Sequence, residues 1–278
     1  MASKSNQLSD RRILRWKAGK AQETSDTLIV EQALELRMAD KTLAVLMRTP
    51  GNDIELIRGL LWSEGVIRRD EKPAELTRSD PNTIELHMDH ELVKERWAER
   101  DVITSSACGV CGASAIARLE ELATSILSDL EWSADKVTSA SARMRSEQAL
   151  FHASGAVHGA ALFNRSGELV QCREDVGRHN AVDKLVGWAL GESLLPLSDH
   201  VLMVSSRLSY EIVQKAICAG IPLVLGVSAP SSLAVDMAEQ WRVTLAGFVR
   251  GQGFNVYSHA YRIVPQNTKS DAESVVST

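Results

Sequence analysis

The second half of the chain alternates short apolar runs with amphipathic segments of similar length. The apolar runs predict β-strands at residues 157–163, 168–172, 201–204, 221–227 and 244–249. The amphipathic segments predict helices at residues 180–190, 209–219 and 231–241. Strands that alternate with helices are typical of a sheet with helices packed on its faces. We therefore expect an α/β fold in this half of the chain.

The rest of the chain divides into segments of different character. We expect a flexible basic arm at 1–25, an N-terminal α+β domain at 26–126, a linker or interdomain helix at 127–150, a C-terminal α/β domain at 151–264 and a flexible tail at 265–278. Within the N-terminal domain the pattern predicts a hairpin at 27–49 turning at Ala39-Asp40-Lys41, a helix at 53–64, and strands at 82–88 and 101–104.

The composition excludes several classes of protein. The chain has 278 residues and a net charge of −5, which argues against bulk nucleic-acid binding. Its four cysteines are too few for a disulfide scaffold and favour a reducing compartment. We find no run of about 18 apolar residues and no apolar stretch after Arg11-Arg12, so neither a membrane span nor a signal peptide is expected. A cytoplasmic location follows.

Two cysteines lie close together in the segment Thr104 to Gly112. Cys108 and Cys111 are flanked by small residues, and an amphipathic helix is predicted directly after them at 113–126. A loop at a helix start favours the thiolate, which is the nucleophile and the metal ligand. Zinc binding lacks a second ligand pair, a thioredoxin-like pair lacks an early βαβ unit, and the small polar neighbours argue against two buried structural cysteines. A persulfide carrier is the fourth alternative, and chemistry alone does not separate it from a redox pair.

Three predicted loops lie between a strand and the following helix, where α/β sheets bind ligands. They are Arg173–Asn180, which contains Arg178 and His179, then Ser205-Ser206-Arg207, and Val227–Ser232, which contains Ser228. Arginines and hydroxyls at a helix N-terminus suit a phosphate. Helix capping and surface ion pairs are the alternative explanation. No metal site is expected in these loops.

A glycine-rich turn follows the last predicted strand. Its residues are Phe248, Val249, Arg250, Gly251, Gln252 and Gly253. The turn lacks the full spacing of a dinucleotide fingerprint, so a Rossmann oxidoreductase is poorly supported, although the backbone can approach a phosphate here. His158, at the start of a buried strand, is expected to be a core residue rather than a catalyst.

Over roughly residues 27–262 the chain resembles the formate dehydrogenase accessory sulfurtransferase family (FdhD/NarQ type), and six sequence blocks carry the resemblance. They are Met47–Gly51, Leu60–Gly65, Ser105–Gly112, Glu174–Lys184, Ser228–Ser231 and Gly247–Gly251. The family's usual Thr-Gly-Gly and Ser-Gly-Arg are here Ala153-Ser154-Gly155 and Ser205-Ser206-Arg207. Small residues occupy both places, so we expect a tuned pocket rather than a lost one.

The resemblance implies a fold and a function. The fold is a C-terminal three-layer α/β/α sandwich, similar to the cytidine-deaminase-like fold, beside the smaller N-terminal domain. Deaminases have the pattern His-x-Glu, and here the position two residues after His158 is Ala160. Deaminase chemistry is therefore not expected. The function is sulfur transfer: Cys108 accepts persulfide sulfur from a cysteine desulfurase, with Cys111 as its partner.

The resemblance also implies a ligand and partners. The acceptor is the molybdenum bis(molybdopterin guanine dinucleotide) cofactor, bound as a substrate and required for formate dehydrogenase activity, and a GDP-like nucleotide is its partial mimic. Cofactor binding is assigned to Arg178, His179, Ser206, Arg207, Ser228 and residues 248–253. The formate dehydrogenase catalytic subunit and a second copy of the chain are the expected partners. A non-catalytic chaperone that binds the molybdenum cofactor is the alternative function.

Overall fold

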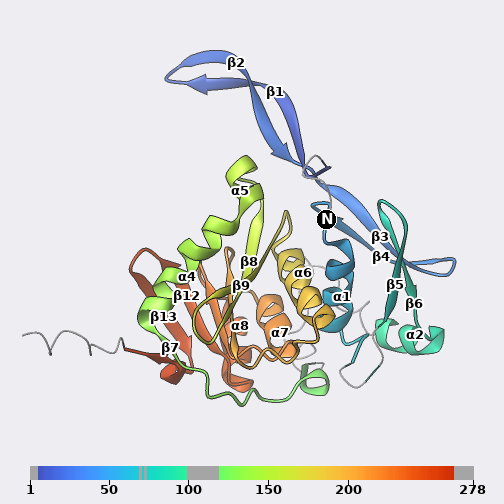
Figure 1. Ribbon diagram of the computed structural model, residues 1–278, viewed down its shortest axis with the longest axis vertical. Helices are drawn as coiled ribbons and strands as arrows, with labels where there is room; N and C mark the ends of the chain where they lie inside the picture. Colours follow the sequence, from blue (N-terminus) through green and yellow to red (C-terminus); the bar gives the residue numbers. More distant parts are fainter. Residues whose placement is uncertain (1–5, 69–70, 72–73, 99–118, 266–278) are drawn as a thin grey trace, which may run out of the picture.

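The computed structural model describes residues 6–68, 71, 74–98 and 119–265. These residues build a six-stranded sheet between helices, a four-stranded sheet beside it and a two-stranded ribbon that projects away from both (Figure 1). None of the described helices is long and apolar enough to cross a membrane.

The six-stranded sheet has the strand order β13-β12-β11-β10-β8-β9. Its strands are β8 (His158–Asn164), β9 (Leu169–Asp175), β10 (His200–Val204), β11 (Leu223–Gly226), β12 (Thr244–Arg250) and β13 (Gly253–Ser258). Strands β10, β11 and β12 are parallel to one another, while β8 is antiparallel to both β10 and β9. The carboxyl ends of β9, β10, β11 and β12 therefore meet at one edge. The sequence predicts all of these strands except β13.

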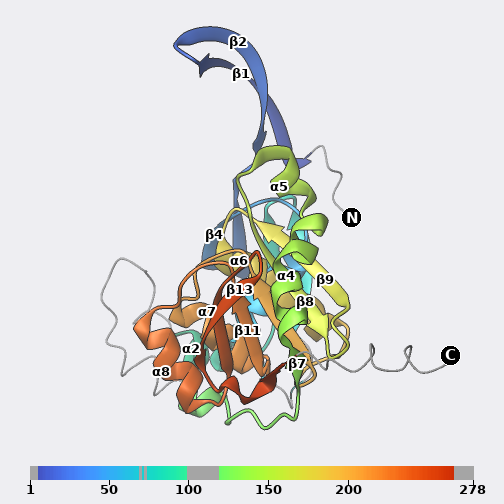
Figure 2. The same ribbon diagram turned by 90° about the vertical axis from the view of Figure 1, so that its left-hand side faces the viewer.

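Alternating residues of this sheet feed two separate cores. Leu162, Leu202 and Val224 pack against α6 (Arg178–Gly191), α7 (Tyr210–Cys218) and α8 (Ser232–Gln240). Phe163, Met203 and Leu225 point the other way, into a core shared with α4 (Ala134–Glu147). Figure 2 shows α4 on the opposite side of the sheet from α7 and α8. The three-layer arrangement expected for this half of the chain is therefore present.

The segment expected to be a linker or interdomain helix, residues 127–150, packs with the sandwich. It contains helix α4, and Trp132 and α4 are part of the sandwich, while α5 (Ala149–Ser154) stands away from its core. The sandwich also includes the end of the segment assigned to the N-terminal domain, because Leu119 and Ile126 are buried among α6, α7 and α8. Helix α4 is mostly polar, and one narrow apolar stripe is enough to cover a sheet face. The sequence of α4 does not show which surface that stripe contacts.

The four-stranded sheet forms the smaller N-terminal part. Its order is β4-β3-β6-β5, made of β3 (Gln32–Met38), β4 (Lys41–Arg48), β5 (Glu75–Asp80) and β6 (Thr83–His87). Helices α1 (Asp53–Ser63) and α2 (His90–Ala98) accompany this sheet, and buried residues of both contribute to its core. The predicted hairpin at 27–49, the helix at 53–64 and the strand at 82–88 are confirmed. The predicted strand at 101–104 lies outside the described residues.

Helix α1 joins the two parts of the molecule by packing closely on α6. A Cβ atom built on Gly59 would lie 1.9 Å from the backbone oxygen of Asp183, and one on Gly187 would lie 1.8 Å from that of Glu55. Only glycine permits this approach of two helix backbones. Arg173 on β9 adds a two-pronged ion pair with Glu55 on α1, at 2.6 and 2.9 Å.

The expected flexible arm contains a β-ribbon. Strand β1 (Leu8–Lys17) pairs along its whole length with β2 (Lys20–Ile29), which runs past the expected boundary at residue 25. Ala18 and Gly19 both have positive φ, as a two-residue hairpin turn requires. Most residues of the ribbon are polar and exposed. Its sequence therefore looks like that of a solvated tail, although the backbone forms strands. Of the expected tail at 265–278, residue 265 is described and the rest lies outside the described residues.

The last described strand pairs with a strand that precedes α4. Strand β14 (Ile263–Val264) pairs in parallel with β7 (Trp132–Ser133), after the short 3-10 helix η2 (Ala260–Arg262). Trp132 is buried and meets Phe163 edge-on, with ring centroids 5.8 Å apart. This contact ties the segment before α4 to the centre of the sheet.

Candidate functional site

Three loops and one hairpin meet at the carboxyl edge of the six-stranded sheet. Backbone pairing links these segments in turn. His158, at the start of β8, pairs with Asp175 at the end of β9, and hydrogen bonds make the remaining links. The N–H of Ser205 donates to the oxygen of Gly159, that of Leu208 to Ala229, and that of Phe248 to Ser228, at 2.9, 3.1 and 3.3 Å. The loops that the sequence singles out are thus brought together as one row, and the backbone of that row is held in place.

Helix α6 begins at this edge with two of the predicted site residues. Arg178 and His179 are its first residues, and its N-cap, Gly177, offers no side chain to the helix N–H groups. Nε of Arg178 is buried and has no hydrogen-bond partner among the described atoms. Free N–H groups and an aligned helix dipole favour an anion at such an end.

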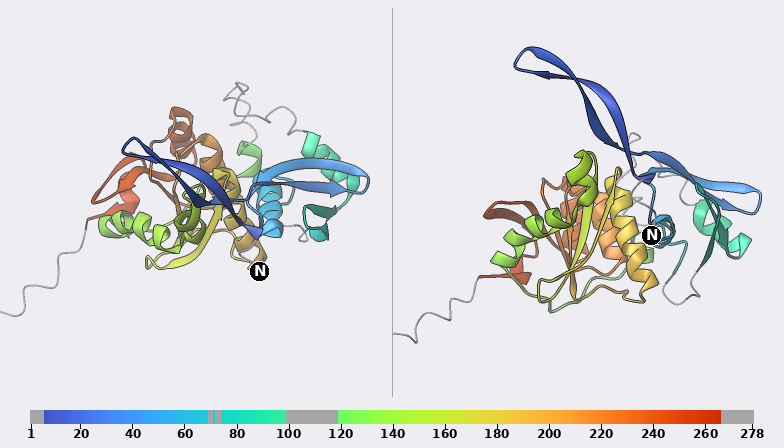
Figure 3. Two further views of the ribbon diagram at one scale, coloured as in Figure 1. Left: turned by 90° about the horizontal axis from the view of Figure 1, so that it is seen from above. Right: turned by 45° about the horizontal axis from the view of Figure 1, so that its top comes forward.

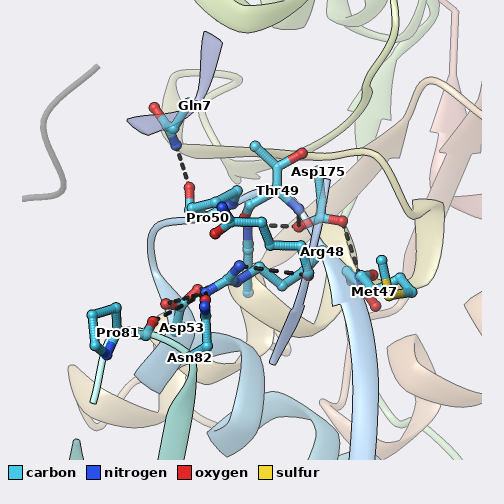
Figure 4. Close-up of polar contacts among 12 residues, drawn as sticks. Gln7, Met47, Arg48, Thr49, Pro50, Asp53, Pro81, Asn82 and Asp175 are labelled. Atoms are coloured by element: carbon cyan, nitrogen blue, oxygen red, sulfur yellow. Dashed lines mark hydrogen bonds and ion pairs between the residues drawn. The ribbon is translucent and has the colours of Figure 1, made fainter. Parts of the chain in front are cut away.

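A buried polar network around Asp175 holds the start of α6 in place, and Figure 4 shows its contact with Thr49. The fully buried carboxylate of Asp175 accepts hydrogen bonds from the N–H of Gly177 at 2.8 Å and from Asn180 at 2.9 Å. It also accepts one from the N–H of Thr49 at 3.1 Å and pairs with Lys184 at 2.7 Å. The N-terminal motif around Thr49 therefore positions Arg178 and His179 from across the domain junction.

Helix α7 also begins at this edge. Ser209 is its N-cap but makes no side-chain capping bond, and its buried Oγ has no partner among the described atoms. Ser206 is buried and donates to the backbone oxygen of Arg207 at 2.9 Å, while Arg207 itself is exposed. The site thus contains a second uncapped helix start with an arginine before it. Helix α8 differs, because Ser231 accepts a hydrogen bond from the N–H of Ala234.

Two histidines in the site have lowered basicity. His158, at the start of β8, places Nδ1 3.4 Å from Oγ of Ser205. Burial, and then the charge of Arg178, lowers the pKa of His158. Burial lowers the pKa of His179 to about 4, with Arg178 adding to the shift and Glu211, 3.7 Å away, opposing it. Both rings are therefore neutral near pH 7 and offer hydrogen bonds without charge.

The turn between β12 and β13 completes the row. Phe248 and Gly251 have positive φ, and Val249 is buried in the core beneath α4. The exposed guanidinium of Arg250 lies 5.7 Å from the ring centroid of Phe248. A Cβ on Gly247 would meet the oxygen of Ser228 at 2.9 Å, so glycine lets these loops touch. Gln252 and Gly253 lie in this turn and at the start of β13, on the solvent side.

The cysteines occupy different environments. Cys108 and Cys111 lie outside the described residues. Burial, followed by the nearby acids Glu174 and Glu147, raises the pKa of Cys172 to about 12, so Cys172 is a thiol and not a thiolate. Cys218 borders a cavity of about 510 Å³ at the opposite edge of the sheet, together with Trp62 and Leu122. Among the described residues, no three His, Cys, Asp or Glu side chains cluster as metal ligands do.

The structure adds residues that the sequence analysis assigned to the core or left out. His158 lines the site, and Asp175, Lys184 and Thr49 hold its geometry. A signal was present for the last three, because they belong to the sequence blocks that carry the family resemblance. Their contact joins residues 126 positions apart, which no local pattern indicates.

The fold and the site together define a mixed α/β protein whose carboxyl sheet edge combines two uncapped helix starts with three arginines. The chain belongs to the FdhD/NarQ family, whose model matches residues 29–264. It is 42% identical to the sulfur carrier protein FdhD of Streptomyces avermitilis, over 91% of this chain and 94% of that protein. It is also 42% identical to the sulfur carrier protein FdhD of Sulfolobus acidocaldarius, over 91% and 97% of the two chains.

A solved structure shares the fold. It is described as a candidate formate dehydrogenase accessory protein from Desulfotalea psychrophila, with a TM-score of 0.74 and 23% sequence identity. The match covers 93% of this chain and all of that one.

Proposed function

We propose that this protein is a sulfurtransferase that carries sulfur for the maturation of formate dehydrogenase. It accepts persulfide sulfur from a cysteine desulfurase on Cys108 and delivers it to the molybdenum bis(molybdopterin guanine dinucleotide) cofactor, its bound substrate. The observation that carries the proposal is the 42% identity, over nine-tenths of the chain, to proteins named sulfur carriers. The Cys-x-x-Cys sequence supplies the chemistry such a name requires.

The first step is a thiol exchange without net oxidation. The thiolate of Cys108 attacks the terminal sulfur of the donor's persulfide, and a new S–S bond forms on Cys108. The S–S bond of the donor breaks, and the donor's cysteine leaves as a thiolate. Cys111 is the neighbouring thiol that assists or resolves the loaded state. Cys172 takes no part, because a buried thiol with a raised pKa is a poor nucleophile.

The cofactor is bound at the carboxyl edge of the six-stranded sheet. Its phosphates face the starts of α6 and α7, with Arg178, Arg207 and Arg250 as counter-charges. The neutral rings of His158 and His179 add hydrogen bonds to polar ligand atoms. The sandwich is further proposed to be cytidine-deaminase-like, which the order β9-β8-β10-β11-β12 with β8 alone reversed supports. A homodimer in the cytoplasm, serving the formate dehydrogenase catalytic subunit, completes the proposal.

Intact-mass spectrometry after incubation with a cysteine desulfurase and cysteine tests the sulfur carrier. We expect a mass gain of one sulfur atom that a reductant removes, present in the wild type and in Cys172→Ala, and absent in Cys108→Ala. Loss only in Cys111→Ala would keep the mechanism and exchange the two cysteines. No gain in the wild type, with a desulfurase active on another acceptor, would overturn the proposal.

Binding of GDP tests the cofactor site separately. Arg207→Ala is expected to weaken binding about tenfold by calorimetry, as loss of one charge-assisted hydrogen bond does. Arg165→Ala is the matched control, because Arg165 is a half-exposed arginine that pairs with Asp129 and Asp199 at the other sheet edge. Equal affinities of the two variants would remove Arg207 from the site.

The chaperone alternative makes a different prediction. A chaperone needs the loops of the carboxyl edge but no reactive sulfur. If Cys108→Ala and Cys111→Ala both support formate dehydrogenase maturation while Arg207→Ala does not, the protein holds the cofactor without transferring sulfur.

A further inference from the structure

The ribbon formed by β1 and β2 is exposed on all sides toward its tip. It extends away from both sheets, as the right-hand view of Figure 3 shows. Trp16 is 69% exposed and Leu14 is 56% exposed, which is unusual for large apolar side chains. A two-stranded ribbon is at best marginally stable in water without a surface to pack on. The tip therefore has the properties of an arm that packs on a surface outside its own fold.

The two faces of the ribbon differ in chemistry. Residues paired directly across the strands share a face, and the pairs Leu14–Glu23 and Trp16–Ala21 place the apolar side chains together. Arg12 and Glu23 lie on this same face. The opposite face carries an excess of cations, with Arg11, Arg15, Lys17 and Lys20 against the single acid Asp26. Residues 8–29 contain five basic and three acidic residues, a net charge of +2, which leaves −7 on the rest of the chain. The ribbon is thus opposite in charge to the rest of its own chain.

A complementary surface exists on the four-stranded sheet. The residues of β3 and β4 that point away from its core include Ala33, Val45 and Met47. Val45 is 62% exposed and Met47 is 52% exposed. Acids extend this face: Glu35 lies on β3, Glu85 on β6 and Glu75 on β5, and Arg37 on β3 is the cation among them. Apolar side chains beside acidic ones match the ribbon face on which Arg12 lies beside Leu14 and Trp16.

We propose that the ribbon of one copy packs its Leu14–Trp16 face on the Val45–Met47 face of a second copy. The contact is reciprocal, so a two-fold dimer uses it twice and leaves neither surface open. Opposite net charges bring the two surfaces together, and the apolar side chains supply the contact area. The proposal names the surface of the homodimer in the proposed function and does not require sulfur transfer.

Sedimentation of the full chain tests the arm. The wild type is expected to be a dimer, and the double variant Leu14→Ser, Trp16→Ser is expected to raise the dissociation constant about 100-fold, as loss of two apolar anchors does. The control double variant, Leu194→Ser with Tyr261→Ser, removes an exposed leucine and an exposed aromatic ring elsewhere and leaves the dimer intact. A wild type that is monomeric, or a dimer that survives in the ribbon variant, would overturn the proposal.

A cross-link identifies the docking surface. Trp16→Cys chains labelled with nitrogen-15 are mixed with unlabelled Val45→Cys chains and oxidised. We expect peptides that join residue 16 of a heavy chain to residue 45 of a light chain. If residue 16 joins other positions instead, the surface assignment is wrong. Sulfur loading measured on the same ribbon variants separates this result from the sulfur-carrier proposal, because the arm contains none of the reactive cysteines.

Discussion

At the scale of single residues, the site depends on a buried ion pair that touches no solvent. Asp175 and Lys184 are both essentially unexposed, and Asp175 holds the start of α6 through three further hydrogen bonds. Asp175→Ala leaves Lys184 buried without its counter-charge, so we expect the free energy of unfolding in urea to fall by about 3–5 kcal/mol. Adding Lys184→Met is expected to recover part of this loss.

The exposed pair of Arg165 and Asp199 is the matched comparison. Arg165→Ala is expected to leave the unfolding midpoint unchanged, because exposed ion pairs are screened by water. An Asp175→Ala protein as stable as the wild type would show that the buried pair does not hold the site together.

His179 is expected to make stability depend on pH. Its pKa in the folded protein is about 4, below the ordinary value of about 6.5, so the unfolded chain takes up the proton first as the pH falls. The ring faces Glu211, Arg178, Lys215 and His158. Between pH 7 and pH 5 the wild type should lose on the order of 1 kcal/mol more stability than His179→Gln does.

Urea unfolding at a series of pH values measures this difference. His90→Gln, an exposed histidine at the start of α2, is the control and should follow the wild type. If His179→Gln loses stability as steeply as the wild type does, the ring is not protected from protonation in the fold.

At the scale of elements, the crossing of α1 and α6 depends on two glycines. Gly187→Ala would place a methyl group 1.8 Å from the backbone oxygen of Glu55, and a helix backbone cannot yield as a side chain can. We expect a loss of about 3 kcal/mol in the free energy of unfolding, in the range of severe overpacking. Thermal unfolding followed by circular dichroism measures it.

Gly191→Ala is the control within the same helix. Its added methyl group would meet only the flexible end of Arg58, at 3.1 Å. Alanine also favours a helix more than glycine does, so no loss is expected. Equal effects at both positions would mean that the loss comes from α6 itself and not from its contact with α1.

At the scale of the whole molecule, the two sheets are expected to unfold together. Residues Asn180 to Gly187 of α6 are all buried, and α1 from the N-terminal part supplies one side of that burial. In calorimetry we therefore expect one transition with equal calorimetric and van't Hoff enthalpies. A fragment that begins at residue 119 should not fold, because its α6 would lose the cover of α1. Two separate transitions would contradict this coupling.

Local sequence patterns predicted much of the sandwich and the sheet edge at which its polar loops meet. A strand buried on both faces is apolar throughout, and a helix on a sheet is apolar on one side, so β8, β10, β11, β12 and α6 to α8 were visible in the sequence. Edge strand β9 was visible as the return strand after a turn. Loops that follow such strands share one edge, so Arg178, Ser206, Arg207 and Phe248 were expected near one another. The pairing of β8 with β9 and the hydrogen bonds between the later loops bring these backbones to one edge of the sheet.

Other features were decided only by tertiary structure. The sequence alone determined which residues turn inward, because apolar residues recur with the period of the helix or strand that buries them. It did not determine what each buried face meets: that α4 covers the sheet, that α1 lies on α6, or that Thr49 reaches Asp175 across 126 residues. The ribbon lacks a core and so has no such period. Contacts between distant segments depend on shape and on the placement of single polar groups, and these exist only once the chain has folded.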